Sequence, residues 1–213
     1  MHTVDRGPEP SGLGSVRRRY TPRWVRHYRD GQGAKPSDAK WRDFDVDVSN
    51  AFSSLCGYCE ERCKGEVDHF RPKSKFPERV YEWNNWVLAC HTCNHKKSGH
   101  WPSGGYVDPC AKSQAARPES HFEFDTKTGE ILSKPGVSAA RHRKANRMIQ
   151  DLGLNAYYRL KARAEWLRLV SKALDTEHDA DNEQLIGILS SRDARFSSIT
   201  RAWLQEQGYS YRD

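Results

Sequence analysis

The sequence predicts an α+β fold in which a small metal-centred module lies between helical segments. Two Cys-x-x-Cys pairs, Cys56/Cys59 and Cys90/Cys93, bound that module. Between the pairs, the stretch 66–70 has strand character, whereas apolar residues recur every three or four positions before Cys56 and after residue 138. From these patterns we expect three parts: a basic, partly disordered N-terminal arm over residues 1–35, a domain over residues 36–135, and a helical region over residues 136–213.

Charge and cysteine usage narrow the class of protein. The 213 residues include 35 Lys and Arg against 28 Asp and Glu, a net charge of +7, which favours nucleic acid as a partner over a membrane surface. No apolar stretch is long enough to span a bilayer, and the basic N-terminus lacks the apolar region of a signal peptide. Four of the six cysteines form close pairs, as metal ligands in a reducing compartment do. We therefore expect a cytoplasmic protein.

The N-terminal third contains three kinds of segment. Residues 1–15 are rich in Gly and Pro and are expected to be disordered. The segment 17–29 has six arginines and no acid, so it could follow a phosphate backbone, form a solvated tail, or dock on the core as a strand. After Pro36-Ser37-Asp38, which can cap a helix, an apolar face predicts a helix towards Leu55. This face consists of Trp41, Phe44, Val48, Ala51, Phe52 and Leu55.

The C-terminal half begins with a predicted hairpin. Residues 121–125 alternate as a strand does, Thr128-Gly129 can form a turn, and Ile131-Leu132 can form the return strand. A helix is then expected to end at Gly153, and Asn155 is expected to cap the next one. Two further short helices are expected to start near Asp181 and Ser191 and to end near Gly208.

The four paired cysteines predict a closed tetrahedral site for structural Zn²⁺. The 30 residues between the pairs exceed the usual gap of a zinc ribbon, which indicates an insertion. Cys63 could compete as a ligand, whereas Cys110 is expected to be an ordinary thiol. A redox Cys-x-x-Cys is the alternative, but it requires only one pair.

The inserted segment contains residues suited to hydrolysis. His69 has a near-neutral pKa as a residue type and can deprotonate an attacking water. Asp68 offers the hard oxygen that Mg²⁺ prefers, and Asn94 could add a second ligand oxygen. Neighbours on a strand point to opposite faces, so Asp68 and His69 can act together only if the backbone twists between them. The alternative is an ordinary surface pair.

Three motifs resemble the zinc-stabilised HNH endonucleases: Cys-Gly-Tyr-Cys at 56–59, Val-Asp-His-Phe-Arg-Pro-Lys at 67–73, and Trp-Asn-Asn-Trp-Val-Leu-Ala-Cys-His-Thr-Cys-Asn-His-Lys-Lys at 83–97. The segments 106–110 and 121–124 are similar to a subgroup, the HNH proteins of Septu-type and retron-associated anti-phage systems. Proteins of that subgroup often work beside an ATPase.

The resemblance implies a ββα-metal fold and a role for each motif residue. His69 would be the general base, Asp68 and Asn94 would hold a catalytic Mg²⁺ or Mn²⁺ ion, and Asn85 would orient His69. Whether His95 joins the coordination shell stays open. The products would be DNA ends with 5′-phosphate and 3′-hydroxyl groups. Four basic residues near the site could hold neighbouring phosphates, or could form an ordinary solvated surface: Arg71, Lys73, Lys96 and Lys97.

The leading hypothesis is therefore a metal-dependent HNH endonuclease of anti-phage defence. One alternative is a zinc-stabilised module that binds nucleic acid without cutting it. Another is an adaptor whose C-terminal helices dock a partner such as an ATPase.

Overall fold

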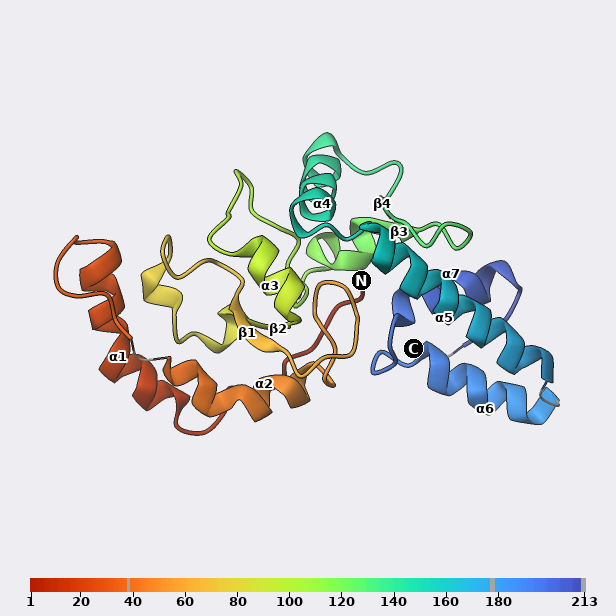
Figure 1. Cartoon of the computed structure of the whole chain (residues 1–213), viewed down its shortest axis with the longest axis horizontal. Helices are drawn as coiled ribbons and strands as arrows, with labels where there is room; N and C mark the ends of the chain where they lie inside the picture. The colour runs from red at the N-terminus through yellow and green to blue at the C-terminus, as the bar shows by residue number, and fades with distance from the viewer. Residues whose placement is uncertain (38, 177–178, 212–213) are drawn as a thin grey trace. The chain divides into compact units, whose positions relative to one another are not determined.

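A computed structural model describes residues 1–37, 39–176 and 179–211 (Figure 1). The chain forms two compact units. The first unit comprises Asp5–Gly57 and Arg62–Gly105, and the second comprises Met1–Val4, Tyr58–Glu61 and Tyr106–Asp213. The expected division at residues 35 and 135 stays a prediction, and Asp38, an expected cap residue, lies outside the described residues. The mixed helix and small-sheet content confirms the α+β prediction.

The first unit is built around a two-stranded sheet followed by a short helix. Strands β1 and β2 are antiparallel, with Asp68 opposite Val87 and His69 opposite Trp86. Helix α3 follows β2 directly, which gives the expected ββα order (Figure 1). The elements of this unit are α1 (Leu13–Tyr28), η1 (Lys40–Phe44), α2 (Asp45–Ala51), β1 (Glu66–His69), η2 (Pro77–Arg79), η3 (Trp83–Asn85), β2 (Trp86–Ala89) and α3 (His91–Lys97).

The apolar face predicted before Cys56 packs against this sheet. The segment is a 3₁₀ turn, η1, followed by the short helix α2, instead of one long helix. Phe44, Val48, Phe52 and Leu55 are buried, and α2 contacts both strands. Beyond α2, Ser53 and Ser54 adopt positive φ angles of 50° and 56°. These angles redirect the chain out of the helix and towards Cys56.

The N-terminal segment differs from the expected partly disordered arm. Thr3 and Val4 are bound through their backbone, with Val4 N donating to Pro109 O at 2.8 Å and Thr3 N donating to Glu119 Oε1 at 2.8 Å. Residues 13–28 form helix α1, so the segment is neither a solvated tail nor a strand. The reason is burial, because Leu13 and Trp24 lie on one side of this helix and are 0% and 2% exposed.

In its described residues the second unit contains a hairpin, four α-helices and two short 3₁₀ turns. The predicted hairpin is confirmed, since β3 and β4 pair antiparallel with Phe124 opposite Ile131. Gly153 ends α4 in the left-handed conformation at φ 59°, as predicted. The elements are η4 (Gln114–Ala116), η5 (Pro118–Ser120), β3 (Phe122–Phe124), β4 (Ile131–Ser133), α4 (Ala139–Leu152), α5 (Tyr157–Thr176), α6 (Asp179–Ser190) and α7 (Ser197–Glu206).

Two expectations for this unit are wrong. Asn155 does not cap the helix that follows, because its side chain instead accepts from Ile131 N and donates to Ile131 O, both at 2.9 Å. Helix α7 starts at Ser197, six residues after the predicted start at Ser191. None of the helices in the described part of the chain combines the length and apolar character needed to cross a membrane.

Candidate active site and metal centre

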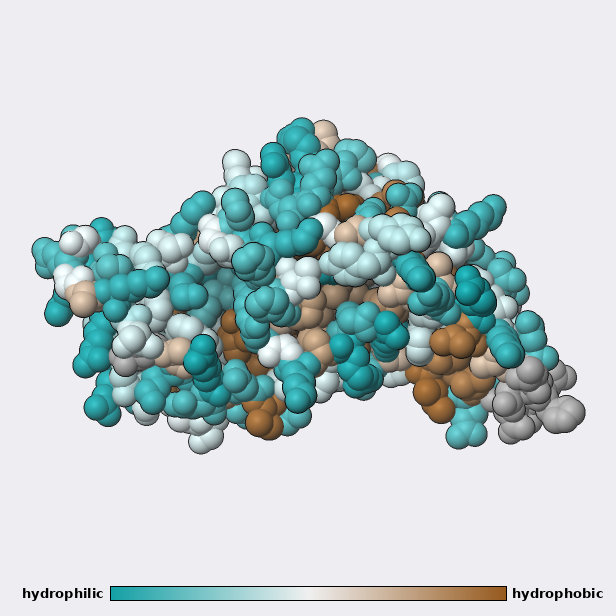
Figure 2. Space-filling view, viewed as in Figure 1, coloured by the Kyte–Doolittle hydropathy of each residue, from teal (hydrophilic) through white to brown (hydrophobic). Residues whose placement is uncertain are grey.

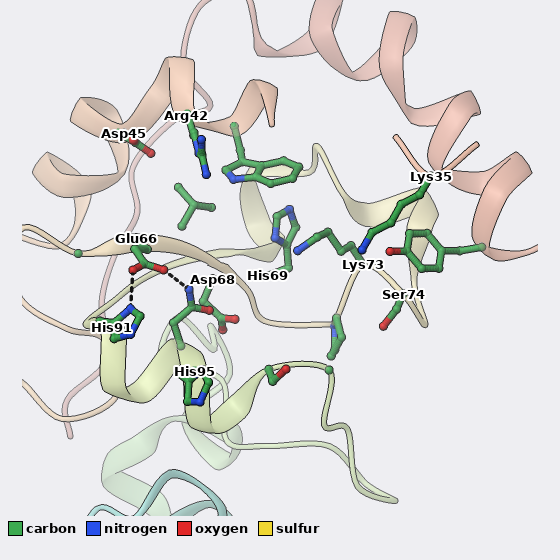
Figure 3. Close-up of a pocket in the computed structure, with 18 residues that line it drawn as sticks. Lys35, Arg42, Asp45, Glu66, Asp68, His69, Lys73, Ser74, His91 and His95 are labelled. Carbon is green, nitrogen blue, oxygen red and sulfur yellow. Dashed lines mark hydrogen bonds and ion pairs between the residues drawn. The ribbon is translucent and has the colours of Figure 1, made fainter. Parts of the chain in front are cut away.

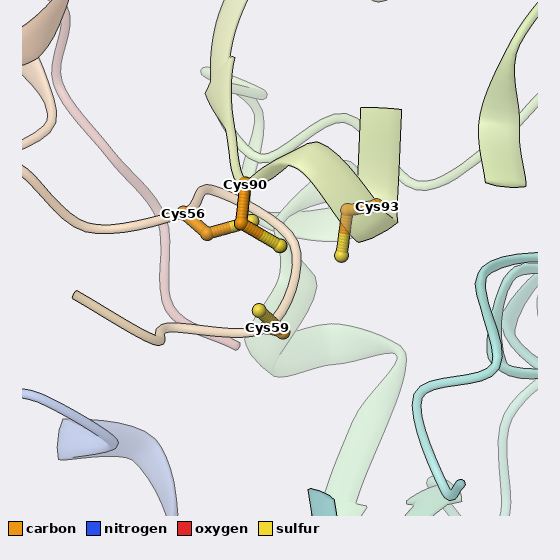
Figure 4. A group of neighbouring side chains, drawn as sticks. All are labelled: Cys56, Cys59, Cys90 and Cys93. Carbon is orange, nitrogen blue, oxygen red and sulfur yellow. The ribbon is translucent and has the colours of Figure 1, made fainter. Parts of the chain in front are cut away.

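The four paired cysteines come together as predicted (Figure 4). Their sulfur atoms all lie within 4.8 Å of one another, and only Cys90 is partly exposed. Gly57 N donates to Leu88 O at 2.8 Å, which holds the first pair beside the end of β2, while Cys90 is the N-cap residue of α3. Four thiol donors at this separation fit a structural zinc site. Among the described residues, Cys63 does not belong to this cluster.

His69 lies at the end of β1 and is 4% exposed. Its Nε2 lies 2.9 Å from Val80 O, which also accepts from Trp86 Nε1 at 2.9 Å. A carbonyl oxygen only accepts, so Nε2 carries the proton and Nδ1 keeps a free lone pair. Burial, with the nearby charge of Lys73, lowers the pKa of His69 to about 3. The ring is therefore neutral at physiological pH.

Asp68 precedes His69 and forms a buried ion pair. The Lys97 ammonium lies 3.0 Å from Oδ1 and 2.9 Å from Oδ2 of Asp68, and it also donates to His69 O at 2.7 Å. Lys97 is 0% exposed and Asp68 is 3% exposed. This lysine was predicted to hold a phosphate at the surface. That expectation is wrong, because Lys97 is enclosed and its donors face the chain itself.

Asp68 and His69 line the same cavity of about 580 Å³ (Figure 3). The sequence pattern allowed this only if the backbone twisted at the end of the strand. Lys73 also lines the cavity, with its ammonium 5.2 Å from the centre of the Trp41 ring. The edge of that ring packs against His69 at 4.8 Å between ring centres. Burial lowers the pKa of Lys73.

Glu66 completes a polar group that the sequence interpretation missed. Its carboxylate accepts from Asn94 Nδ2 at 2.6 Å and lies 3.0 Å from His91 Nδ1 (Figure 3). These hydrogen bonds, from His91 first and then Asn94, lower the pKa of Glu66. The sequence did indicate that Glu66 belongs with Asp68, because it lies two residues earlier and residues two apart share one face of a strand. His95 stacks on His91 with ring centres 6.0 Å apart.

Asn85 fastens the loop between the strands. Its Oδ1 accepts from Arg71 N at 2.8 Å, and its Nδ2 donates to Arg71 O and Arg79 O, both at 3.1 Å. The residue after Arg79 is Val80, whose carbonyl fixes the His69 ring. Asn85 O also accepts from Phe70 N at 2.8 Å, so the geometry links Asn85 to His69 through backbone groups at Val80 and at Phe70. A direct orienting role for Asn85 stays a prediction.

The other two basic candidates differ in their surroundings. Arg71 is partly buried, and its guanidinium lies 5.7 Å from the ring centre of Phe76 and 6.0 Å from that of Trp101. Lys96 is exposed on α3. Contacts of Arg71, Lys73 and Lys96 with phosphates stay predictions.

The cavity offers oxygen atoms suited to a divalent ion. Asp68 lines the cavity with a carboxylate, which could hold an ion on its cavity side beside Lys97. Asn94 turns its amide nitrogen towards Glu66 and leaves Oδ1 as an acceptor. Both residues line the cavity with His69. Oxygen donors of this kind fit Mg²⁺ or Mn²⁺.

Comparison with known proteins agrees with this geometry. Residues 56–99 match the family model described as HNH endonuclease. The chain is also 26% identical over 156 residues to the Septu protein PtuB of Bacillus thuringiensis, a match that covers 69% of this chain and 56% of that relative. The chain thus spans little more than half the length of the curated relative that it matches. Residues 56–99, with their cysteine cluster and ββα order, are thus similar to an HNH endonuclease domain, in a chain similar to a Septu protein.

Proposed function

We propose that this chain is a metal-dependent endonuclease that hydrolyses phosphodiester bonds of DNA. The observation that supports this most strongly is the state of His69. Its ring is buried at a cavity wall, its Nε2–H is held by Val80 O, and its Nδ1 is left as a base beside Asp68. A neutral histidine held in one orientation can take a proton from water, although its lowered pKa makes it a weaker base than a free histidine.

In the proposed reaction, His69 Nδ1 accepts a proton from the water that attacks the scissile phosphorus. The bond to the 3′-oxygen then breaks and this oxygen takes a proton from solvent, which leaves 5′-phosphate and 3′-hydroxyl ends. Asp68 and Asn94 would hold a divalent ion, which when bound stabilises negative charge on the phosphate and the leaving oxygen. Lys73, at the same cavity, would attract a phosphate of the substrate.

The zinc ion proposed at the four cysteines would have a structural role. All four thiolates would be occupied as ligands, which leaves no open position for a substrate. Cys90 is the N-cap residue of α3, and Asn94 lies one turn further along in the same helix. A zinc ion there would therefore fix the helix that carries one of the two proposed ligands of the catalytic ion.

We place this activity in anti-phage defence, on the strength of the similarity to a Septu protein. A nuclease of this kind needs restraint in its own cell, and an ATPase partner could supply it. Leu169 on α5 and Ile188 on α6 are 63% and 59% exposed, and Figure 2 shows hydrophobic residues gathered over these helices. Such exposed apolar side chains are typical of a docking surface. The same observation favours the second candidate, an adaptor without cleavage of its own.

The proposal is tested by incubating the zinc-loaded chain with supercoiled plasmid, single-stranded DNA and RNA, with Mg²⁺, Mn²⁺ or EDTA. We expect nicking or linearisation of the plasmid that depends on the divalent ion. The assay is repeated with the product of any neighbouring gene that encodes an ATPase. Absence of cutting in both conditions, with zinc bound and the fold intact, would favour the binding or adaptor function.

A further inference from the structure

Helix α1 presents a row of arginines to solvent. Its exposed positions include Arg18, Arg19, Arg23 and Arg26, and the row continues just beyond the helix to Arg29, which forms an ion pair with Glu78. From Arg19 on these positions recur every three or four residues, and Arg18 directly precedes them, so all five lie along one side of the helix. From Arg18 to Arg29 the row spans about 17 Å, at a rise of about 1.5 Å per residue. No acidic residue lies in the helix.

The opposite side of α1 is fixed to the first unit by aromatic packing. Trp24 is 2% exposed and meets Trp41 with ring centres 5.5 Å apart. Tyr20 packs against Tyr81 at 6.2 Å. Trp41 is also the residue whose ring contacts His69. The arginine row is therefore held by the same small core that holds the proposed general base.

A turn after α1 joins this row to the active-site cavity. Gln32 N donates to Arg26 O at 2.9 Å, and His27 Nδ1 lies 3.1 Å from Gly33 O, so the chain folds back on the end of the helix. This brings Lys35 to the wall of the active-site cavity, where Figure 3 shows it near Lys73. Lys35 also lines a second hollow, of about 320 Å³, together with Arg23 and Arg26.

We propose that the arginine row of α1 binds the phosphate backbone of duplex DNA outside the bond that is cut. The proposal rests on the proposed function and names a second contact region for the same substrate. Lys73, Lys35, Arg26 and Arg23 form a continuous series of cations from the cavity to the helix. On the face seen in Figure 2, the surface over α1 is mostly hydrophilic, as a phosphate-binding surface requires. Contacts of this kind position the duplex and read no sequence.

The test measures binding separately from cleavage. All proteins carry His69→Ala, and binding of a fluorescent duplex of arbitrary sequence is followed by anisotropy at several salt concentrations. The double variant Arg23→Gln with Arg26→Gln should weaken binding about tenfold. It should also reduce the steepness of the fall of the log association constant with log salt by about two, because each phosphate contact contributes about 0.9 to that slope. Arg18→Gln with Arg19→Gln should act in the same direction. The loss should be similar for duplexes of unrelated sequence.

The matched control is Arg143→Gln with Arg147→Gln, which removes the same charge from exposed positions of α4. It should change the affinity less than twofold. The proposal is overturned if both α1 pairs behave like this control, or if all three pairs weaken binding equally, which would indicate only an effect of net charge. If the protein without His69→Ala cuts DNA while both α1 pairs leave binding unchanged, this inference fails and the proposed function stands. If the protein binds DNA through α1 but never cuts it, this inference stands and the proposed function fails.

Discussion

Replacing Lys97 by Met should destabilise the first unit strongly, although Lys97 appears in the sequence as one of two adjacent lysines. The substitution keeps most of the side-chain volume but removes the ammonium that lies within 3.0 Å of both Asp68 oxygens. It also removes the donor to His69 O. Asp68 would then be a buried carboxylate without its charged partner.

The size of the effect follows from burial. Removing one partner of a buried ion pair costs about 3–5 kcal/mol, because the remaining charge is left uncompensated. The penalty cannot exceed the cost of protonating the carboxylate, because protonation removes the charge. For an ordinary aspartate at pH 7 this cost is about 4 kcal/mol. We therefore expect a loss of about 4 kcal/mol in the free energy of unfolding. That is a large share of the stability of a typical domain, which is about 5–15 kcal/mol.

The measurement is urea unfolding of the zinc-loaded protein, with zinc content determined for each variant. The control is Lys96→Met, which changes the neighbouring exposed lysine and should cost less than about 0.5 kcal/mol. The double variant Asp68→Asn with Lys97→Met should lose less than the sum of the two single changes, because the charge is removed with its partner. A Lys97→Met protein within about 1 kcal/mol of Lys96→Met would refute the reasoning about this buried pair.

Three further predictions concern other sites. Cys90→Ser should abolish zinc binding and unfold the cysteine-bounded domain, because zinc binding is coupled to folding; a variant that keeps its zinc and its melting temperature would contradict the four-cysteine site. Asn85→Ala should lower the free energy of unfolding by about 2–4 kcal/mol, since it removes the side-chain partner of Arg71 N and Arg71 O and one of the two donors to Arg79 O; urea unfolding would measure this, and a loss below about 1 kcal/mol would count against it. Glu119→Gln should lower stability by about 1 kcal/mol at pH 7, after allowance for its partial exposure, and by less at pH 3. Burial raises the pKa of Glu119, but hydrogen bonds from Thr3 and Arg192 outweigh burial and hold the pKa at about 2. The stability that the ionised Glu119 contributes is therefore present above pH 4.5 and is lost as the pH falls towards 2. An equal effect of Glu119→Gln in melting curves at both pH values would contradict this.

Local patterns predicted the elements that depend on local chemistry. The hairpin at 122–133 follows from alternation and a Thr-Gly turn, and the end of α4 follows from a glycine in the left-handed conformation. The four-cysteine cluster was predictable as well, because the tight spacing within each pair places two thiols close together.

Contacts between distant residues were not predictable in the same way. Nothing beside Lys97 distinguishes it from Lys96, and its partner Asp68 lies 29 residues earlier in the sequence. Helix α1 was not predicted from the sequence, because its many arginines leave an apolar side of only a few residues, such as Leu13 and Trp24. Asn155 has the right residue type for a helix cap, but it binds the backbone of Ile131 on the neighbouring hairpin.

The most direct test of the central claim is single-turnover cleavage of DNA by the wild-type chain and by His69→Ala, with zinc content and melting temperature measured in parallel. If His69 is the general base, the variant should lose at least about a hundredfold in rate, because general-base catalysis contributes about 10²–10⁴-fold. Its zinc content should be unchanged. A His69→Ala protein that cuts at the wild-type rate would contradict the account, and so would one that loses activity only because it loses its zinc and unfolds.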